Sequence, residues 1–159
     1  MVRLLLIIIL SLATSLAIAE CHAPDPVGTV RWIYQFHPEF YVYQNGSHDF
    51  LSKELMNLLE AAWKCEKETG YQCGLDAVPW TNAQDGEILG MPSFRLASST
   101  KYTAMVHMAF KFDWNETSPP LTNGAEIFMV RSQNSSCWVL DDLIGPKKRS
   151  MKRQLRSSH

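Results

Sequence analysis

The segment from Lys101 to Trp114 constrains the fold most strongly, because apolar side chains occupy every second position in it. The apolar set is Tyr102, Ala104, Val106, Met108, Phe110, Phe112 and Trp114. A period of two predicts a strand with one face in a hydrophobic core. A strand this long is typical of the middle of a bent antiparallel sheet, so other elements must cover its apolar face.

Two helices are predicted ahead of this strand. The first begins at Asp25-Pro26, because Asp caps a helix and Pro fits its first position, and it ends before Pro38. The second runs from about residue 49 to 67 and ends near Gly70. Its apolar stripe includes three leucines that we expect to cover the long strand: Leu51, Leu55 and Leu59.

The segments around the long strand predict the rest of an antiparallel meander. Residues 74–92 are punctuated by Pro and Gly and are expected to be irregular. Strands are expected at 94–99, 101–114, 125–132 and 137–143, with turns at 118–124 and 134–136. The sequence therefore predicts an α+β domain in which two N-terminal helices pack on a curved antiparallel sheet of about four strands.

Residues 1–19 are expected to be an export signal. Arg3 precedes an apolar run at 4–10, and Ala17-Ile18-Ala19 is a small-x-small cleavage site. A transmembrane anchor is disfavoured because no basic cluster follows the apolar run. Lipid attachment at Cys21 is disfavoured because Glu20, not a small residue, precedes it. The expected organisation is a signal at 1–19, one domain at 20–146 and a basic flexible tail at 147–159.

Charge is divided unevenly between the predicted domain and its tail. The chain has 16 acidic and 15 basic residues, and every acidic residue lies before Lys147. The tail carries six basic residues and no acidic one. We expect the tail to be solvated, with contact to anionic lipid, polysaccharide or an acidic partner as the alternative. An exported chain with an acidic body is not expected to bind nucleic acid.

Four cysteines lie after the export signal, and an even number in an exported chain predicts disulfides. Cys65 and Cys73 flank a short loop, so we expect a Cys65–Cys73 bond, with Cys21–Cys137 as the remaining pair. A zinc site is disfavoured because the chain has no CxxC pair. We expect no metal and no cofactor.

Three short stretches resemble an uncharacterised family of exported bacterial proteins and lipoproteins. They are Phe50-Leu51-Ser52-Lys53-Glu54-Leu55, Leu75-Asp76-x-x-Pro79-Trp80-x-x-Ala83-Gln84-Asp85, and Cys137-Trp138-Val139-Leu140-Asp141-Asp142-Leu143-Ile144. The order of helices and sheet is similar to the nuclear-transport-factor-2-like, or SnoaL-like, cone. The resemblance implies this fold and a bacterial periplasmic location, otherwise an extracellular one. The chain departs from the pattern by lacking a lipid-attachment cysteine and an evident early strand between the helices.

Catalytic candidates follow from the resemblance to cone-fold enzymes. Such enzymes pair a histidine or carboxylate base with a tyrosine or acid in the pocket. The candidates of these types are His107, Asp85, Asp76, Tyr34 and Tyr43. The structural interpretation of His107 is a partly exposed strand histidine, and that of Asp76 and Asp85 is a loop or helix cap. The paired Asp141-Asp142 is expected to cap the sheet edge or bind backbone amides. No phosphate-binding loop, G-x-S-x-G or H-E-x-x-H motif occurs.

These observations favour a non-enzymatic exported binding protein, of inhibitor or immunity type, that acts by protein–protein contact. The aromatic linker, residues 39–47, offers Phe40, Tyr41 and Tyr43 as a recognition surface. One alternative is a small cone-pocket enzyme (hydrolase, dehydratase or isomerase) using His107 with an acidic partner. The other is a passive carrier of a small ligand. Glycosylation motifs predict surface positions at Asn45, Asn115 and Asn134.

Overall fold

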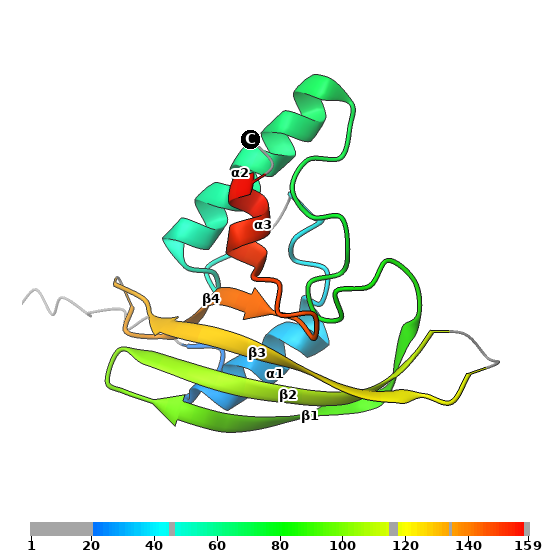
Figure 1. Ribbon diagram of the computed structural model, residues 1–159. Helices are drawn as coiled ribbons and strands as arrows, with labels where there is room; N and C mark the ends of the chain where they lie inside the picture. The colour runs from blue at the N-terminus through cyan, green and yellow to red at the C-terminus, as the bar shows by residue number, and fades with distance from the viewer. Residues whose placement is uncertain (1–20, 45–46, 115–117, 134, 158–159) are drawn as a thin grey trace, which may run out of the picture.

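A single antiparallel sheet with strand order β1-β2-β3-β4 organises the structure (Figure 1). The computed structural model describes residues 21–44, 47–114, 118–133 and 135–157. The elements in chain order are α1 (Pro26–Phe36), α2 (Lys53–Thr69), β1 (Glu87–Ser99), β2 (Thr103–Asp113), β3 (Leu121–Arg131), β4 (Trp138–Ile144) and α3 (Met151–Ser157). This confirms an α+β chain with a four-stranded sheet. The export signal at 1–19 and Asn45, Asn115 and Asn134 lie outside the described residues.

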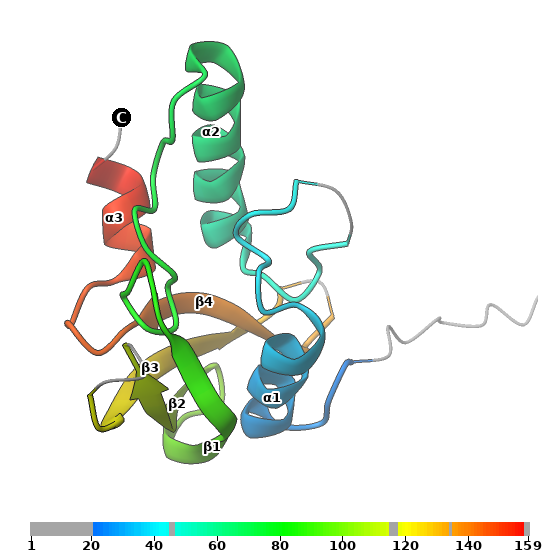
Figure 2. The ribbon, with the colours of Figure 1, turned by 90° about the vertical axis from the view of Figure 1, so that its right-hand side faces the viewer.

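The sheet curls around α1 (Figure 2). This helix contacts β1, β2 and β4, so it touches both edge strands, which requires a curved sheet. The alternation predicted for β2 is confirmed, because the even-numbered residues from Ala104 to Phe112 are buried against α1 and the rest of the core. Tyr102 and Trp114 lie beyond the strand ends and are 63% and 42% exposed.

The second helix does not take the expected place over the long strand. Leu51 lies before the helix, in a parallel β-bridge with Leu140, and Ser52 caps α2 through a bond from the Leu55 amide to its hydroxyl oxygen. Beyond this start α2 points away from the sheet and lies beside α3 (Figures 1 and 2). The first helix covers β2 instead, because the curved sheet leaves a concavity that the shorter α1 fills.

Two strands begin earlier than the sequence predicts. β1 starts at Glu87 rather than at residue 94, because the breakers Gly90 and Pro92 lie in a bulge between Leu89 and Ser93. β3 starts at Leu121, and the Asn123-Gly124 pair expected in the turn forms ladder pairs with Phe110 and Ala109. A bulge or a strand interior accommodates breaker residues that local reasoning assigns to loops.

The predicted flexible tail is wrong for residues 151–157, which form α3. Met151 and Leu155 are fully buried, one helical turn apart, and they extend the core. Lys152 is only 8% exposed, and its Nζ donates to Asp141 Oδ1 at 3.1 Å and to Glu54 Oε2 at 2.5 Å. The many basic residues of this segment made its amphipathic pattern difficult to recognise in the sequence. Acidic side chains of the folded domain pair with some of these basic residues.

Asp142 joins the end of the sheet to α3. Its carboxylate accepts bonds from the Leu143 amide at 2.8 Å, the Lys152 amide at 3.0 Å and the Ser150 hydroxyl at 2.6 Å. The expectation that the Asp141-Asp142 pair binds backbone amides is therefore confirmed for Asp142, whereas the Asp141 carboxylate pairs with Lys152. The bonds from the Lys152 amide and the Ser150 hydroxyl hold the start of α3 against β4.

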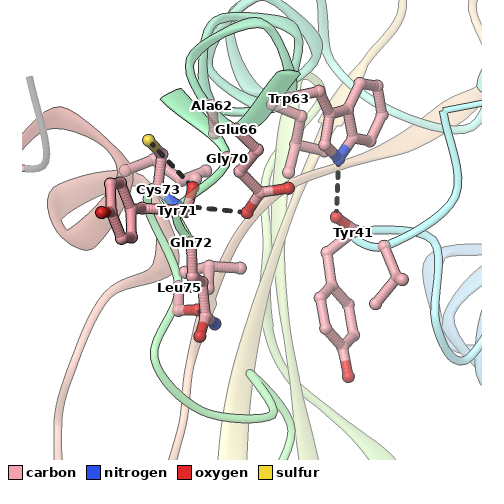
Figure 3. A pocket seen from close by; sticks show the side chains of 12 residues that line it. Tyr41, Ala62, Trp63, Glu66, Gly70, Tyr71, Gln72, Cys73 and Leu75 are labelled. Atoms are coloured by element: carbon pink, nitrogen blue, oxygen red, sulfur yellow. Dashed lines mark hydrogen bonds between the residues drawn. The ribbon is translucent and has the colours of Figure 1, made fainter. Parts of the chain in front are cut away.

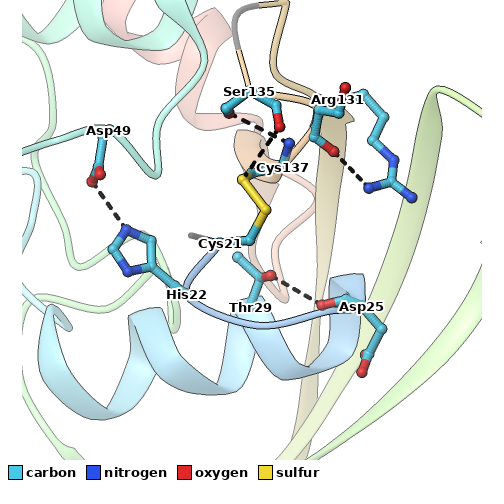
Figure 4. Close-up of a disulfide and its surroundings, with 9 residues drawn as sticks. Cys21, His22, Asp25, Thr29, Asp49, Arg131, Ser135 and Cys137 are labelled. Atoms are coloured by element: carbon cyan, nitrogen blue, oxygen red, sulfur yellow. Dashed lines mark hydrogen bonds and ion pairs between the residues drawn. A yellow bond between two sulfur atoms is a disulfide. The ribbon is translucent and has the colours of Figure 1, made fainter. Parts of the chain in front are cut away.

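Both expected disulfides are present, Cys65–Cys73 and Cys21–Cys137, with Cα atoms 6.0 Å and 5.4 Å apart. The second ties the segment before α1 to the start of β4 (Figure 4). Two disulfides are compatible with an exported protein in an oxidising compartment. Among the residues described, none of the helices has the length and hydropathy needed to cross a bilayer.

Candidate functional site

An open groove of about 410 Å³ lies between the aromatic linker, α2, the Cys65–Cys73 loop and α3 (Figure 3). We call it the aromatic groove. Its lining comprises Tyr41, Val42, Leu59, Ala62, Trp63, Glu66, Gly70, Tyr71, Gln72, Cys73, Leu75 and Leu155. The volume is that of a typical ligand or side-chain pocket. Aliphatic side chains from two helices form much of the lining, and three aromatic residues join them.

Two tryptophans hold the aromatic linker in place. The indole Nε1 of Trp63 in α2 donates to the Tyr41 carbonyl oxygen at 2.9 Å (Figure 3). The indole Nε1 of Trp80 donates to the Pro38 carbonyl oxygen at 2.8 Å. Both indoles are almost fully buried, so these bonds are shielded from water. The linker is therefore fixed at Tyr41, beside α2, and the chain just before it is fixed at Pro38, so this wall of the groove is formed before any ligand arrives.

The opposite wall is the short loop closed by the Cys65–Cys73 disulfide. Glu66 Oε1 accepts a bond from the Cys73 amide at 3.2 Å, and Thr69 Oγ1 accepts one from the Tyr71 amide at 3.2 Å. Gln72 Nε2 donates to the Leu75 carbonyl oxygen. These bonds and the disulfide fix the loop while leaving the Tyr71 side chain 80% exposed. A large aromatic side chain presented on a rigid loop is a feature of recognition surfaces.

The aromatic groove can hold an apolar side chain of a ligand together with one hydrogen-bond donor of that ligand. Leu59, Ala62, Leu75 and Leu155 form a buried apolar floor. The exposed side chains of Val42 and Tyr71 supply apolar contact, and the Glu66 carboxylate is a half-buried acceptor beside them. Burial, and then the nearby Glu39, raise the pKa of the Tyr41 hydroxyl, so this group stays a neutral donor at physiological pH. The arrangement suits binding, since it offers contact area and a few polar groups.

The three aromatic residues proposed for recognition have different places. Phe40 is 3% exposed and packs edge-on against Phe50 and Trp80, so it belongs to the core and not to a surface. Tyr41 is half-buried and lines the groove. Tyr43 is 59% exposed outside the groove lining, and a hydrogen bond with Glu39 raises its pKa.

His107 lies on the sheet face away from α1. Its neighbours Val106 and Met108 are fully buried, so the strand alternation turns His107 to the other face, in the same row as Arg95 and Glu126. It lines neither the aromatic groove nor the second hollow described below. Its Nδ1 is buried without a hydrogen bond to the described residues. The ring lies over Gly124, where a Cβ would come within 3.0 Å of Cε1.

The other catalytic candidates contact residues other than His107. Tyr34 packs against Trp80 and Phe94 in the core, and burial raises its pKa. The Asp76 carboxylate lies 3.7 Å from the Arg149 guanidinium, and its carbonyl oxygen accepts a bond from Gln84. Asp85 is exposed. Across the part of the chain that the structure describes, no hydrogen bond or ion pair joins His107 to any of the three.

Histidines and aromatic rings cluster near the Cys21–Cys137 bond, an arrangement that sequence reasoning missed. The His22 ring stacks on Trp32 at 3.8 Å between centroids, and its Nε2 lies 3.0 Å from Asp49 Oδ1 (Figure 4). The His37 ring stacks on Phe50 at 4.8 Å. Burial, followed by the charges of His22 and His48, lowers the pKa of His37. Within 21–44, 47–114, 118–133 and 135–157, no cluster of three or more His, Cys, Asp or Glu side chains is arranged to hold a metal ion.

Most residues of the groove were not among the predicted site residues, and Trp63, Glu66 and Tyr71 are the chief examples. Trp63 reads in sequence as part of the buried stripe of α2, and Tyr71 as an ordinary loop residue. The one available signal was the position of Tyr71 inside the loop closed by Cys65 and Cys73, where a disulfide rigidifies the backbone. Comparison of the chain with protein-family models, curated proteins and solved structures gives no match.

Proposed function

We propose that the protein is an exported, non-enzymatic binding protein, of inhibitor or immunity type, that captures a protein partner through the aromatic groove. The observation that carries the proposal is the combination of two fixed walls with an exposed aromatic residue between α2 and α3. Tyr41 and Trp63 are held by a buried indole bond, and Tyr71 projects from a disulfide-closed loop.

The preformed walls favour affinity because little conformational entropy is lost on binding. Tyr and Trp are enriched at the centres of protein interfaces, where they combine large contact area with one polar group. A partner segment that fits the groove carries an apolar side chain for the exposed side chains of Val42 and Tyr71. A donor group beside it, such as a lysine ammonium, meets the Glu66 carboxylate.

The resemblance described above supports two further parts of this proposal. We propose that the curved sheet around α1 is a variant of the nuclear-transport-factor-2-like cone, and that the protein works in the bacterial periplasm. The disulfide pairing supports an oxidising compartment, and α1 in the concavity of the sheet supports the cone. In this variant α1 fills the concavity, so the binding surface lies on the outside, at α2.

Site-specific photocrosslinking tests the proposal. The photoreactive residue p-benzoylphenylalanine replaces Tyr71, and the purified protein is irradiated in an extract of the compartment to which the source organism exports it. We expect one discrete protein adduct, identified by mass spectrometry, that excess wild-type protein suppresses. Excess Tyr71→Ala protein should suppress it poorly, because truncation removes the aromatic anchor.

The matched control places the same photoreactive residue at Tyr102, which is also an exposed tyrosine on a turn, 63% accessible, but lies at the β1–β2 connection. It should give no discrete adduct. Equal adduct patterns from positions 71 and 102 would contradict the proposal. A small ligand retained in native mass spectrometry, with no protein adduct, would favour a passive carrier instead.

A further inference from the structure

A second hollow, of about 600 Å³, lies on the other side of α3 from the aromatic groove. We call it the cationic hollow. Its lining comprises Gly74, Asp76, Lys147, Lys148, Arg149, Ser150, Arg153, Gln154 and Ser157. It shares no lining residue with the aromatic groove. Four cationic side chains therefore surround one carboxylate in a space large enough for a small molecule.

The backbone turn that carries three of these cations is held in a defined shape. The Lys148 amide donates to the Gly145 carbonyl oxygen at 2.9 Å, and the Gly145 amide donates to that of Arg149 at 3.3 Å. Asn82, which is 4% exposed, accepts a bond from the Lys147 amide at 3.3 Å through its side-chain oxygen. A Cβ at Gly145 would collide with the Asn82 amide. The turn is therefore clamped to the loop that precedes β1.

The acidic residues nearby do not neutralise all of these cations. Lys148 Nζ pairs with Glu126 at 2.8 Å, whereas Arg149 lies 3.7 Å from Asp76, a distance longer than a hydrogen bond. Arg153 has no ion pair to a described acidic residue, and the Lys147 ammonium lies over the Trp114 ring at 5.5 Å.

The remaining cations of this segment are already neutralised elsewhere. Lys152 pairs with Glu54 and Asp141, and Arg156 pairs with Glu54. Among the described residues, the cations of this segment without an acidic partner are thus Lys147 and Arg153, both beside the hollow. Closely spaced cations repel one another, and an anion between them removes that repulsion.

We propose that the cationic hollow binds a small, multiply charged oxyanion of the phosphate class. Guanidinium groups bind phosphate with two parallel hydrogen bonds, and lysine supplies a point charge. A free anion fits better than a membrane surface, because the cations line a hollow. A small ligand in it can contact them from several sides.

Isothermal titration of the purified full-length protein with pyrophosphate in low-salt buffer tests this site. We expect saturable binding that weakens as sodium chloride is added, since the contacts are between charges. The Lys147→Gln/Arg153→Gln variant should bind pyrophosphate at least about tenfold more weakly, because two charge-assisted contacts are lost. Both residues are exposed, so the variant should fold, and its thermal melting curve checks this.

The Lys64→Gln/Lys101→Gln variant is the matched control, because it removes the same charge from exposed positions outside the hollow. It should bind pyrophosphate within about twofold of wild type, because it alters only long-range, salt-screened electrostatics. Vesicles of phosphatidylglycerol and phosphatidylcholine separate the two sources of phosphate. Vesicle binding that pyrophosphate displaces, and that is lost in Lys147→Gln/Arg153→Gln, would identify a lipid headgroup as the ligand. Absence of binding to either probe, or equal binding by both variants, would overturn the proposal.

Discussion

The aromatic groove and the cationic hollow lie on opposite sides of one wall. The wall consists of α3 and the segment from Gly74 to Asp76, which follows the disulfide-closed loop. Leu75 and Leu155 line the groove, whereas their neighbours Asp76 and Gln154 line the hollow. One layer of chain thus separates an apolar lining from a charged one, because the neighbours Gln154 and Leu155 point to different sides of the α3 helix.

The difference between the two regions lies in how each is held. The groove depends on a disulfide, two indole hydrogen bonds and apolar packing. The hollow depends on a turn clamped by Asn82 and on the docking of α3. Damage to the common wall should therefore affect both sites, whereas damage to one set of supports should affect one.

The largest effect is expected from Leu155→Ala, which truncates a side chain that is 1% exposed in the common wall. Loss of contact and the remaining cavity should lower the free energy of unfolding by about 2–5 kcal/mol. Urea unfolding measures it, and both photocrosslinking at position 71 and pyrophosphate binding should weaken.

Leu121→Ala is the control for this change, since Leu121 is 51% exposed at the start of β3. It should alter the free energy of unfolding by less than about 0.5 kcal/mol. If the two variants lose equal stability, α3 is not docked on the core as described.

Removing the loop disulfide in Cys65→Ser/Cys73→Ser separates the two regions. The bond closes a loop of 8 residues' separation, so its loss should cost about 2–3 kcal/mol through the entropy gained by the unfolded chain. The groove wall loosens, and the adduct at Tyr71 should weaken, whereas pyrophosphate binding should persist. Equal loss of both activities would contradict the separate support of the two sites.

Lys152→Met tests the ionic attachment of α3 beneath both regions. The variant keeps an apolar side chain of similar length but removes bonds to Glu54 and Asp141, which should cost about 1–3 kcal/mol at neutral pH. Burial lowers the pKa of Lys152, but the hydrogen bonds and charges of Glu54 and Asp141 together outweigh it and raise the pKa above that of an ordinary lysine. The stabilisation is therefore complete below the ordinary lysine pKa and disappears as pH rises through the raised pKa.

Urea unfolding of both proteins from neutral to alkaline pH measures this difference. The gap between wild type and Lys152→Met should be constant near neutrality and should narrow above the ordinary lysine pKa. Lys64→Met, which removes an exposed pair with Glu68, should cost only about 0.3–0.5 kcal/mol. A gap that does not change at alkaline pH would show that the Lys152 charge contributes nothing.

The smallest effect on stability is expected from Tyr71→Ala and Lys147→Gln/Arg153→Gln, each within about 0.5 kcal/mol because the side chains are exposed. Their binding effects should nevertheless be opposite. Tyr71→Ala should lose partner capture and keep pyrophosphate binding, and the charge variant should do the reverse. Loss of both activities in either variant would show that the two regions are coupled.

Much of the fold could be predicted from local pattern. The period of two gave the correct buried face of β2, Asp25-Pro26 marked the start of α1, and the cysteine spacing gave both disulfides. Strand starts were less predictable, because Gly90 and Asn123-Gly124 break strands locally but are tolerated in a bulge and in the ladder. The groove residues Trp63 and Tyr71 gave little signal, since their role depends on segments distant in sequence.

The strand Thr103–Asp113 and the segment Met151–Ser157 show what sequence alone determined and what tertiary structure decided. The alternation in the first is a local property of side-chain direction, so the sequence determined which face is buried. The covering of that face by α1 required the curvature of the whole sheet. In the second, a run of basic residues predicts an exposed, solvated segment. The fold brings Glu54, Asp141 and the apolar core beside it, and part of the segment is buried instead. Burial of charge becomes favourable only when distant partners are in place, and only the folded chain supplies them.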